Sequence, residues 1–373
     1  MIEAKTLFNL FQENDIDFYT GVPDSLLKDY CAYISDNTKT ENHIISANEG
    51  GAISIAVGYH LSTGKVPIVY LQNSGLGNCV NPLMSLADKE VYGIPMILMI
   101  GWRGEPNVKD EPQHIKQGRI QNSLLESMET PYVIIDKETK ELDKIIFQLK
   151  QKTIEEKTPV AIIVKKDTFT PYKLNLIEEI QYELTREEAI KIILNKLPEN
   201  SVIVSTTGMA SREVFEHRES KNESHEKDFL TVGAMGHCSQ IALGISLNTK
   251  KPTICLDGDG AVLMHMGSLP IIGQYAKNNF LHIVLNNGAH DSVGGQPTIG
   301  FCISVSEIAI SSGYKIAYTV DKKEDLSKIL DNINFTNGPL LLEVKIKKGA
   351  RKNLGRPTTS PTENKQAIMN YLS

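Results

Sequence analysis

The sequence predicts an α/β protein with two domains, each a mostly parallel sheet flanked by helices. Three observations predict this fold class. The chain has 373 residues, more than one hydrophobic core usually serves. Apolar runs of strand length alternate with amphipathic helical patterns, and these runs are continuous, as in strands buried on both faces. The alternation pauses around residues 171–184 and then restarts, which predicts a second domain after that segment.

The first half contains the first set of alternating elements. Residues 4–13 have a helical pattern, and PDSLLKDYCAYIS (23–35) predicts a helix capped by Asp24 or Ser25. Strands are expected in DFYTGV (17–22), VPIVYLQ (66–72), IPMILMIG (94–101), PYVIID (131–136) and TPVAIIVKK (158–166).

The second half of the chain shows the same alternation of predicted strands and helices. TREEAIKIILNKL (185–197) is an amphipathic helix with a Thr-x-x-Glu capping box. Strands are expected in SVIVSTTG (201–208), TICLDGDG (253–260), LHIVLNNG (281–288) and PLLLEVKI (339–346). We therefore expect domains at residues 1–172 and 185–373, joined by a linker at 173–184.

Composition and sequence pattern disfavour several classes of protein. The formal net charge is −6, so a nucleic-acid-binding role is disfavoured. No apolar run approaches the roughly 20 residues that span a bilayer, and the N-terminus lacks a signal-peptide core. The five cysteines show no CxxC spacing, which indicates neither a disulfide framework nor a zinc site. We expect a cytoplasmic protein with reduced, mostly buried thiols and no membrane partner.

Polar residues follow two of the predicted strands. LDGDG (256–260) ends one strand, and Asn286 and Asn287 end the next, one crossover later. A right-handed crossover brings the carboxyl ends of such strands together, where ligands bind in open parallel sheets. One carboxylate, amide oxygens and backbone carbonyls suit Mg²⁺ or Ca²⁺, and Mg²⁺ holding a phosphorylated ligand is the commoner use. Mn²⁺ stays an open alternative to Mg²⁺. The glycines would let backbone N–H groups approach a diphosphate.

A GDG followed about two dozen residues later by NN resembles the signature of thiamine-diphosphate enzymes. The resemblance implies thiamine diphosphate and Mg²⁺ as cofactors. By position it implies that the metal is bound by Asp259, Asn287 and the main-chain carbonyl of Ala289. Gly258, Gly260 and Ala261 would then lie beside the cofactor.

Three further stretches match the same family. In ISANEGGAISIAVGYH (45–60), Glu49 stands where the family keeps the glutamate that contacts the pyrimidine N1′ atom. In TVGAMGHCSQIALG (231–244), Met235 would bend the cofactor and the carbonyl of Gly233 would accept from its 4′-amino group. In STTGMAS (205–211), backbone amides near Gly208 and Met209 would meet the diphosphate.

The compact plan has no room for a middle domain, and it resembles the branch of this family that decarboxylates phosphonopyruvate or sulfopyruvate. The motifs WRGEPNVKDEPQH (102–114), HDSVGGQPT (290–298) and LGRPTTSPTENK (354–365) point to the phosphono branch. That branch implies conversion of 3-phosphonopyruvate to phosphonoacetaldehyde and CO₂. The substrate would be a small 2-oxo acid with two anionic groups. Candidates to bind it are Arg212, Arg103 and Lys109.

The chain contains no HH pair of the kind that acetaldehyde-forming relatives use. His290 and Asp24 are therefore the candidates for a catalytic role beside Glu49, with Asp291 and Gln296 as weaker ones. The resemblance also implies that the cofactor lies between two subunits, so at least a homodimer is expected.

Several alternatives stay open. Sulfopyruvate decarboxylation shares every cofactor residue, and carboligation or pyruvate decarboxylation would need a less cationic pocket. A non-catalytic thiamine-diphosphate sensor would be expected to lose the activating glutamate, yet Glu49 is present. The basic stretch KIKKGARKNLGR (345–356) could bind nucleic acid, but a solvated or site-covering segment fits an acidic protein better.

Overall fold

The structure, a computed structural model, describes residues 1–175 and 182–373. The chain divides into two compact units. Unit 1 comprises Met1–Glu178 and Val293–Gln296, and unit 2 comprises Glu179–Ser292 and Pro297–Ser373. Half of the linker expected at 173–184 falls at residues 176–181, outside the described residues. The expected domain boundaries stay a prediction.

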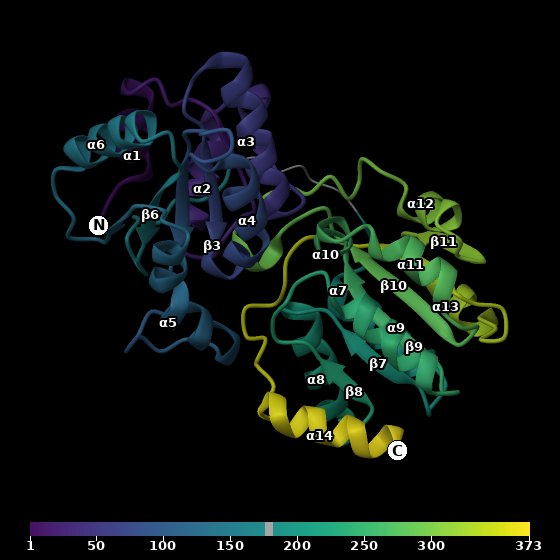
Figure 1. The fold of residues 1–373 in the computed structure, drawn as a ribbon. Coiled ribbons are helices and arrows are strands. Elements are labelled where there is room, and N and C mark those ends of the chain that lie inside the picture. Colours follow the sequence, from purple (N-terminus) through teal and green to yellow (C-terminus); the bar gives the residue numbers. More distant parts are fainter. Residues whose placement is uncertain (176–181) are drawn as a thin grey trace. The chain divides into compact units, whose positions relative to one another are not determined.

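Unit 1 is built on a six-stranded sheet in the order β2-β1-β3-β4-β6-β5, and every strand pair is parallel. Figure 1 labels β3 and β6 of this sheet and the helices around it. The strands are β1 (Tyr19–Gly21), β2 (His43–Ile45), β3 (Ile68–Gln72), β4 (Ile97–Gly101), β5 (Tyr132–Ile135) and β6 (Val160–Val164). The helices are α1 (Ala4–Glu13), α2 (Lys28–Asn37), α3 (Glu49–Thr63), α4 (Leu76–Pro82), α5 (Pro112–Ser127) and α6 (Leu142–Glu155).

Both faces of this sheet are covered by apolar side chains. Alternate residues of β3 lie in different clusters: Ile68 and Tyr70 pack with α1, α2 and α6, whereas Val69 and Leu71 pack with α3, α4 and α5. Strands buried on both faces read as continuous apolar runs because no position faces water. The predicted helix–sheet–helix layering of this half is confirmed.

Unit 2 has a second all-parallel sheet, in the order β11-β12-β10-β9-β7-β8. Its strands are β7 (Val202–Ser205), β8 (Asp228–Leu230), β9 (Thr253–Gly258), β10 (Phe280–Asn286), β11 (Ile316–Val320) and β12 (Leu340–Lys345). Its helices are α7 (Arg186–Lys196), α8 (Met209–Lys221), α9 (Cys238–Asn248), α10 (Asp259–Met264), α11 (Ser268–Tyr275), α12 (Val305–Ser311), α13 (Lys323–Asn332) and α14 (Pro361–Leu372).

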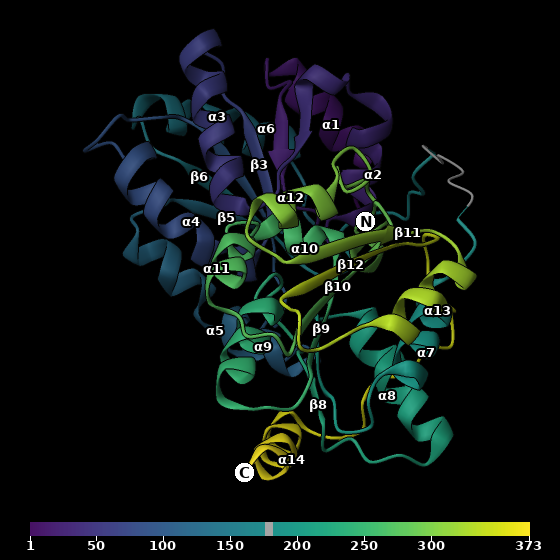
Figure 2. The ribbon, with the colours of Figure 1, turned by 90° about the vertical axis from the view of Figure 1, so that its right-hand side faces the viewer.

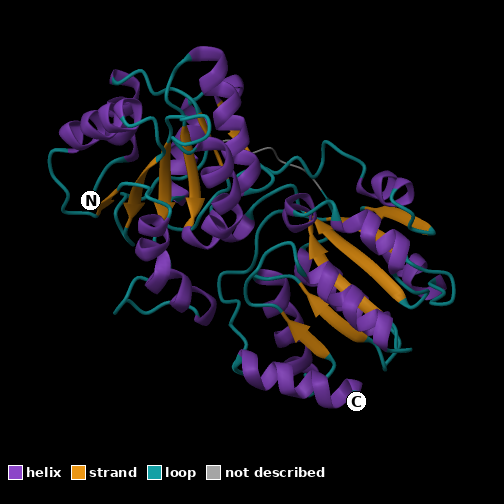
Figure 3. Ribbon diagram, viewed as in Figure 1, coloured by secondary structure: helices purple, strands orange, loops and turns teal. Residues whose placement is uncertain are grey.

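Helices again cover both faces. One apolar cluster joins the sheet to α7, α8 and α13, and the other joins it to α9, α10, α11 and α12. Figure 3 shows these strands enclosed by helices, and Figure 2 shows α14 beside β8, where Asn364 donates to the Asp228 carbonyl at 2.7 Å. Read from the opposite edge, the strand order of unit 2 repeats that of unit 1.

The local helix predictions have different outcomes. The capping box of α7 is confirmed, because the Thr185 side chain accepts from the Glu188 N–H and the Glu188 side chain accepts from the Thr185 N–H. The helix expected from residue 23 is too long: α2 begins at Lys28. Asp24 accepts instead from the backbone N–H groups of Leu26 and Leu27, at 2.7 and 3.1 Å, and so stabilises a turn before the helix. No described helix is both long enough and apolar enough to cross a bilayer.

Candidate active site

The two polar strand ends predicted to meet do lie side by side. Strands β9 and β10 are neighbours, with Gly258 opposite Leu285 in register. Asp259 therefore opens α10 directly beside Asn287, whose backbone N–H lies 3.4 Å from Asp259 Oδ1. Parallel pairing places both carboxyl ends at one edge of the sheet, as the spacing predicted.

The oxygen atoms at this edge fit a hard divalent cation. Asp259 is buried, and burial raises the pKa of its carboxyl to about 6. Thr298 donates to its Oδ2 atom, but among described residues no cationic side chain pairs with it. A metal ion would offset the cost of burying this charge. Asp259, the Asn287 side-chain oxygen and the Ala289 carbonyl are hard oxygen ligands of the kind that Mg²⁺ uses.

The first acid and the first amide of the two pairs have structural roles instead. Asp257 accepts from the Gly258 N–H at 2.9 Å and lies 3.2 Å from His282 Nε2. Asn286 Nδ2 donates to the Gly300 carbonyl at 2.8 Å and to Glu343 at 2.7 Å. The second member of each pair, Asp259 and Asn287, is therefore the candidate to bind a ligand.

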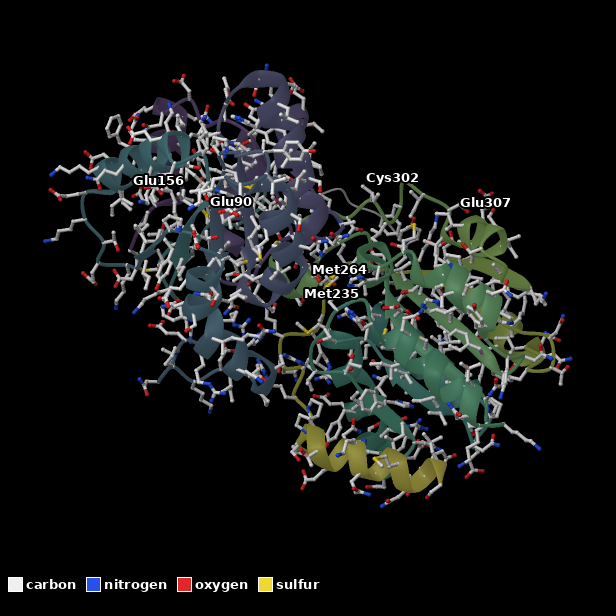
Figure 4. All side chains as sticks on the ribbon, viewed as in Figure 1. Glu90, Glu156, Met235, Met264, Cys302 and Glu307 are labelled. Atoms are coloured by element: carbon white, nitrogen blue, oxygen red, sulfur yellow. The ribbon has the colours of Figure 1, made fainter. Side chains whose placement is uncertain are left out.

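Gly260 lies where a predicted cofactor-binding residue, Met235, and a predicted catalytic residue, His290, converge. A Cβ atom placed on Gly260 would lie 3.1 Å from the Met235 methyl carbon and 3.2 Å from the His290 ring. Met235 comes from the loop between β8 and α9 (Figure 4), and His290 follows the metal-site turn. Burial lowers the pKa of His290 to about 4, so its imidazole is neutral at physiological pH. A thioether and a neutral imidazole thus flank the glycine-rich turn.

The Gly233 loop and the start of α8 are the remaining predicted contacts in unit 2. The backbone next to Gly233 is bent sharply, with Ala234 at φ +54° and Gly236 at φ +82°. Gly208 precedes α8 with φ +95° and has open space on its Cβ side, as does Gly258. The free N–H groups of the first turn of α8, beginning at Met209, can bind phosphate. Ala261 is buried in the first turn of α10.

Arg212, also in the first turn of α8, is the predicted substrate cation that stays available. It is half-buried and donates no hydrogen bond to any described residue, and burial lowers the pKa of its guanidinium. A partly buried cation without a protein acceptor is suited to an anionic ligand.

In unit 1, Glu49 opens α3 and is buried. Its Oε2 atom accepts from Asn78 Nδ2 at 2.7 Å. Its carboxylate lies directly over Gly75, where an added Cβ would be 2.3 Å from Oε1. Neither Asn78 nor Gly75 was singled out from the sequence, because contacts between separate segments leave no local pattern.

The two other predicted cations differ from Arg212. Arg103 donates from Nε and Nη2 to Asp110 at 2.8 and 2.5 Å, and from Nη1 to Ser25 at 2.7 Å. Lys109 is exposed on the same loop. The acid that pairs with Arg103 partly neutralises its charge, which weakens it as an anion site but does not exclude it.

Several buried polar groups of unit 1 have atoms without a hydrogen-bond partner among described residues, and Asp24 Oδ1 and His114 Nδ1 are two of these atoms. Burial raises the pKa of Asp24 to about 6 and lowers that of His114 to about 4. Arg103 interacts electrostatically with both. The sequence marks His114 only as part of the WRGEPNVKDEPQH motif. Its burial in the structure makes it a further candidate for a functional residue.

Three other potential ligands lie beneath the metal-site turn: Cys238, Cys255 and Asp257, whose ligand atoms are within 4.8 Å of one another. The two sulfur atoms are 3.7 Å apart, and burial raises the pKa of the Cys255 thiol well above its usual range. Asp257 is already held by Gly258 and His282. We therefore interpret this cluster as a hydrogen-bonded support for β9. Of the five cysteines, only Cys302 is exposed.

Comparisons with known proteins identify the family. The family model described as "Thiamine pyrophosphate enzyme, N-terminal TPP binding domain" matches residues 3–126, and its C-terminal counterpart matches residues 206–344. A phosphonopyruvate decarboxylase of Streptomyces viridochromogenes is 33% identical over 92% of this chain and 88% of its own length. The chain belongs to the phosphonopyruvate decarboxylase family of thiamine pyrophosphate enzymes.

Two more known proteins are similar to this chain over most of its length. A phosphonopyruvate decarboxylase of Streptomyces hygroscopicus is 30% identical over 97% of this chain and 92% of its own length. A sulfopyruvate decarboxylase of Methanosarcina acetivorans is 27% identical over 85% of this chain and 84% of its own length. The predicted family, thiamine diphosphate as cofactor and the assignment to the carboxy-lyases are confirmed.

Proposed function

We propose that this protein catalyses the decarboxylation of 3-phosphonopyruvate to phosphonoacetaldehyde and CO₂, with thiamine diphosphate and Mg²⁺. The product is an aldehyde that carries a carbon–phosphorus bond, so the reaction belongs to the biosynthesis of phosphonates of the 2-aminoethylphosphonate type. Irreversible loss of CO₂ would draw forward an unfavourable earlier step that forms that bond.

The observation that carries the proposal is the convergence at the ends of β9 and β10. Asp259 and Asn287 lie side by side there and, with Ala289, would provide the oxygen ligands of Mg²⁺, and Met235 and His290 flank Gly260 beside them. Two phosphonopyruvate decarboxylases resemble the chain over most of its length, which supports the substrate.

Thiamine diphosphate, when bound, supplies the nucleophilic carbon and the electron sink that decarboxylation requires. Glu49 would hold a proton at the pyrimidine N1′ atom, and Asn78, which donates to the Glu49 carboxylate, would orient it for that contact. The N–H groups at the start of α8 and of the GDG turn would bind the diphosphate. The carbonyl of Gly233 would accept from the 4′-amino group.

Arg212 binds the phosphonate in this proposal, because its guanidinium has no acceptor among described residues whereas Arg103 is paired with Asp110. Arg103 and Lys109 would contribute a weaker positive field. His290 and Asp24 handle protons: a neutral imidazole can accept one, and a carboxyl with a pKa of about 6 can donate one near neutral pH.

A substrate panel tests the proposal. Aldehyde formation is measured from phosphonopyruvate, sulfopyruvate and pyruvate, each with and without thiamine diphosphate and Mg²⁺. Glu49→Gln is compared with Glu90→Gln, the same substitution at an exposed residue of unit 1 (Figure 4). We expect cofactor-dependent turnover of phosphonopyruvate that is lost in Glu49→Gln and kept in Glu90→Gln.

The other outcomes identify the alternatives. Preference for sulfopyruvate would keep the cofactor site and reassign the substrate, in line with the Methanosarcina relative. Preference for pyruvate, or carboligation, would indicate a less cationic pocket. Tight cofactor binding without turnover of any 2-oxo acid would make the protein a sensor.

We also propose that the cofactor is bound between two subunits, so that Glu49 of one and Asp259 of the other form each site. Co-expressed Glu49→Gln and Asp259→Asn chains test this assembly, because each variant alone would be inactive. A shared site predicts recovery of about a quarter of wild-type activity, since half of the dimers are mixed and one of their two sites is intact. No recovery would place both residues in one chain's own site.

The five free thiols support a reducing, cytoplasmic location, which cell fractionation would test.

A further inference from the structure

The Asn287 side chain is oriented by a neighbouring carboxylate. Asn287 Nδ2 donates to Asp291 Oδ2 at 2.6 Å. A carboxylate can only accept hydrogen bonds, so the NH₂ group of the amide must face Asp291. The Oδ1 atom is thereby turned to the opposite side, where the Ala289 N–H lies 3.1 Å from it. Asp291 and the Ala289 N–H thus fix the two ends of the amide, and the loss of Asp291 would remove the acceptor that holds the NH₂ end. An NH₂ group in place of the oxygen cannot bind a metal.

A buried arginine fixes Asp291 in turn. Arg186 Nη1 donates to the same Oδ2 atom at 3.1 Å. Its Nε and Nη2 atoms donate to the two oxygens of Glu213, at 2.8 and 3.1 Å. Arg186 and Glu213 are 7% and 3% exposed, so the two hydrogen bonds between them are shielded from water. Arg186 is the first residue of α7, where the helix dipole disfavours a positive charge, and these two acids offset that disadvantage.

The C-terminal segment reaches the same carboxylate. The Gly349 N–H donates to Asp291 Oδ2 at 2.9 Å, which gives that oxygen three donors. Two residues later, Arg351 pairs with Glu187 at 3.0 Å and with Glu216, acids on α7 and α8. Arg351 of the basic stretch 345–356 is thus neutralised by protein carboxylates.

We propose that Asp291 is the positioning residue of the metal site: it presents the oxygen of Asn287 to Mg²⁺, and the Arg186–Glu213 pair holds it in place. The inference rests on the proposed cofactor site, and it goes beyond that site's ligands. Groups that orient a metal ligand typically contribute 10- to 100-fold to metal affinity. Within the described part of the chain, Asp291 forms a hydrogen bond with only one proposed metal ligand, Asn287.

Metal affinity provides a readout that does not depend on turnover. Mn²⁺ is titrated into apoprotein with excess thiamine diphosphate, and free Mn²⁺ is measured by electron paramagnetic resonance. Asp291→Ala removes the orienting acceptor, and Asp291→Asn keeps an acceptor that can also donate. The matched control is Asp228→Asn, in another buried pair of unit 2: Arg218 donates to Asp228 at 2.9 and 3.0 Å.

We expect Asp291→Ala to raise the Mn²⁺ dissociation constant about 10- to 100-fold and Asp291→Asn to raise it less. Asp228→Asn should lower the melting temperature and change Mn²⁺ affinity less than about twofold, because its pair does not touch Asn287. Unchanged affinity in Asp291→Ala would overturn the proposal, and so would an equal loss in Asp228→Asn. If Asp291→Ala does not fold, affinity equal to wild type in Asp291→Asn overturns it. Wild-type protein that binds no Mn²⁺ would instead refute the cofactor site itself.

Discussion

Gly75→Ala tests how closely Glu49 must be placed. Gly75 ends a short 3₁₀ turn (Asn73–Gly75) after β3, with φ −76° and ψ −11°, which alanine adopts without strain. The only obstacle is space: the new Cβ would lie 2.3 Å from Glu49 Oε1, 2.5 Å from Cδ and 2.6 Å from Cγ. Ordinary contact begins near 3.4 Å, so the carboxylate must move by about 1 Å. A displacement of that size can reduce a rate by about 100-fold.

The assay compares Gly75→Ala with Gly77→Ala, where an added Cβ would meet nothing within 4 Å. Decarboxylation of phosphonopyruvate and exchange of the thiamine C2 proton, followed by NMR, are measured for both. We expect both rates to fall by about 100-fold in Gly75→Ala. Gly77→Ala should keep wild-type rates and gain up to about 1 kcal/mol of stability from helix propensity in α4. A Gly75→Ala enzyme within twofold of wild type would show that Glu49 tolerates displacement or does not act at N1′.

Three other predictions concern separate parts of the chain. Burial raises the pKa of Asp24 from 3.8 to about 6, so the folded state binds the proton more tightly and stability falls as pH rises from about 4 to 6. Asp24→Asn should therefore stabilise the apoprotein by roughly 2–3 kcal/mol at pH 7 and by less than about 1 kcal/mol at pH 4, measured by urea unfolding. A gain that does not depend on pH would contradict this. Asp259→Asn apoprotein should have a melting temperature no lower than that of wild-type apoprotein. Mg²⁺ with thiamine diphosphate should raise the melting temperature of the wild type but not of this variant, and a retained rise would exclude Asp259 as a ligand. Arg351→Ala should speed tryptic cleavage after Lys347 and Lys352, because the ion pairs that hold this segment are lost. Mass spectrometry measures the cleavage, and equal rates in variant and wild type would show that these ion pairs do not order the segment.

The strands found from the sequence are mainly the central ones. β3, β4, β6, β9, β10 and β12 read as continuous apolar runs because both of their faces are covered. Three strands were missed: β2, β8 and β11 are the edge strand at one side of unit 1 and both edge strands of unit 2. β2 and β8 have only three residues each, and β11 is largely half-buried or exposed, so none produces a long apolar run.

Part of the candidate site could likewise be predicted from the sequence, and part of it could not. The proximity of Asp259 and Asn287 was predictable because strand pairing alone places two neighbouring carboxyl ends together. The Arg103–Asp110 pair was not predicted, although the two residues are only seven apart, because the fold of a loop rich in glycine and proline decides which charges meet. The Arg186–Asp291 contact joins residues 105 apart and leaves no trace in any local pattern.

The repeated strand order allows the two units to be compared position by position, like two copies of one scaffold. Strand β3 of unit 1 corresponds to β9 of unit 2, and β2 corresponds to β8. The turn after the third strand therefore holds the proposed metal ligand Asp259 in one copy, and in the other it is Gly75, which makes room for Glu49. The segment after the second strand leads to Glu49 in one copy and to Met235 in the other. Structural duplication followed by divergence would account for this pattern, in which equivalent loops of the two units carry different candidate residues.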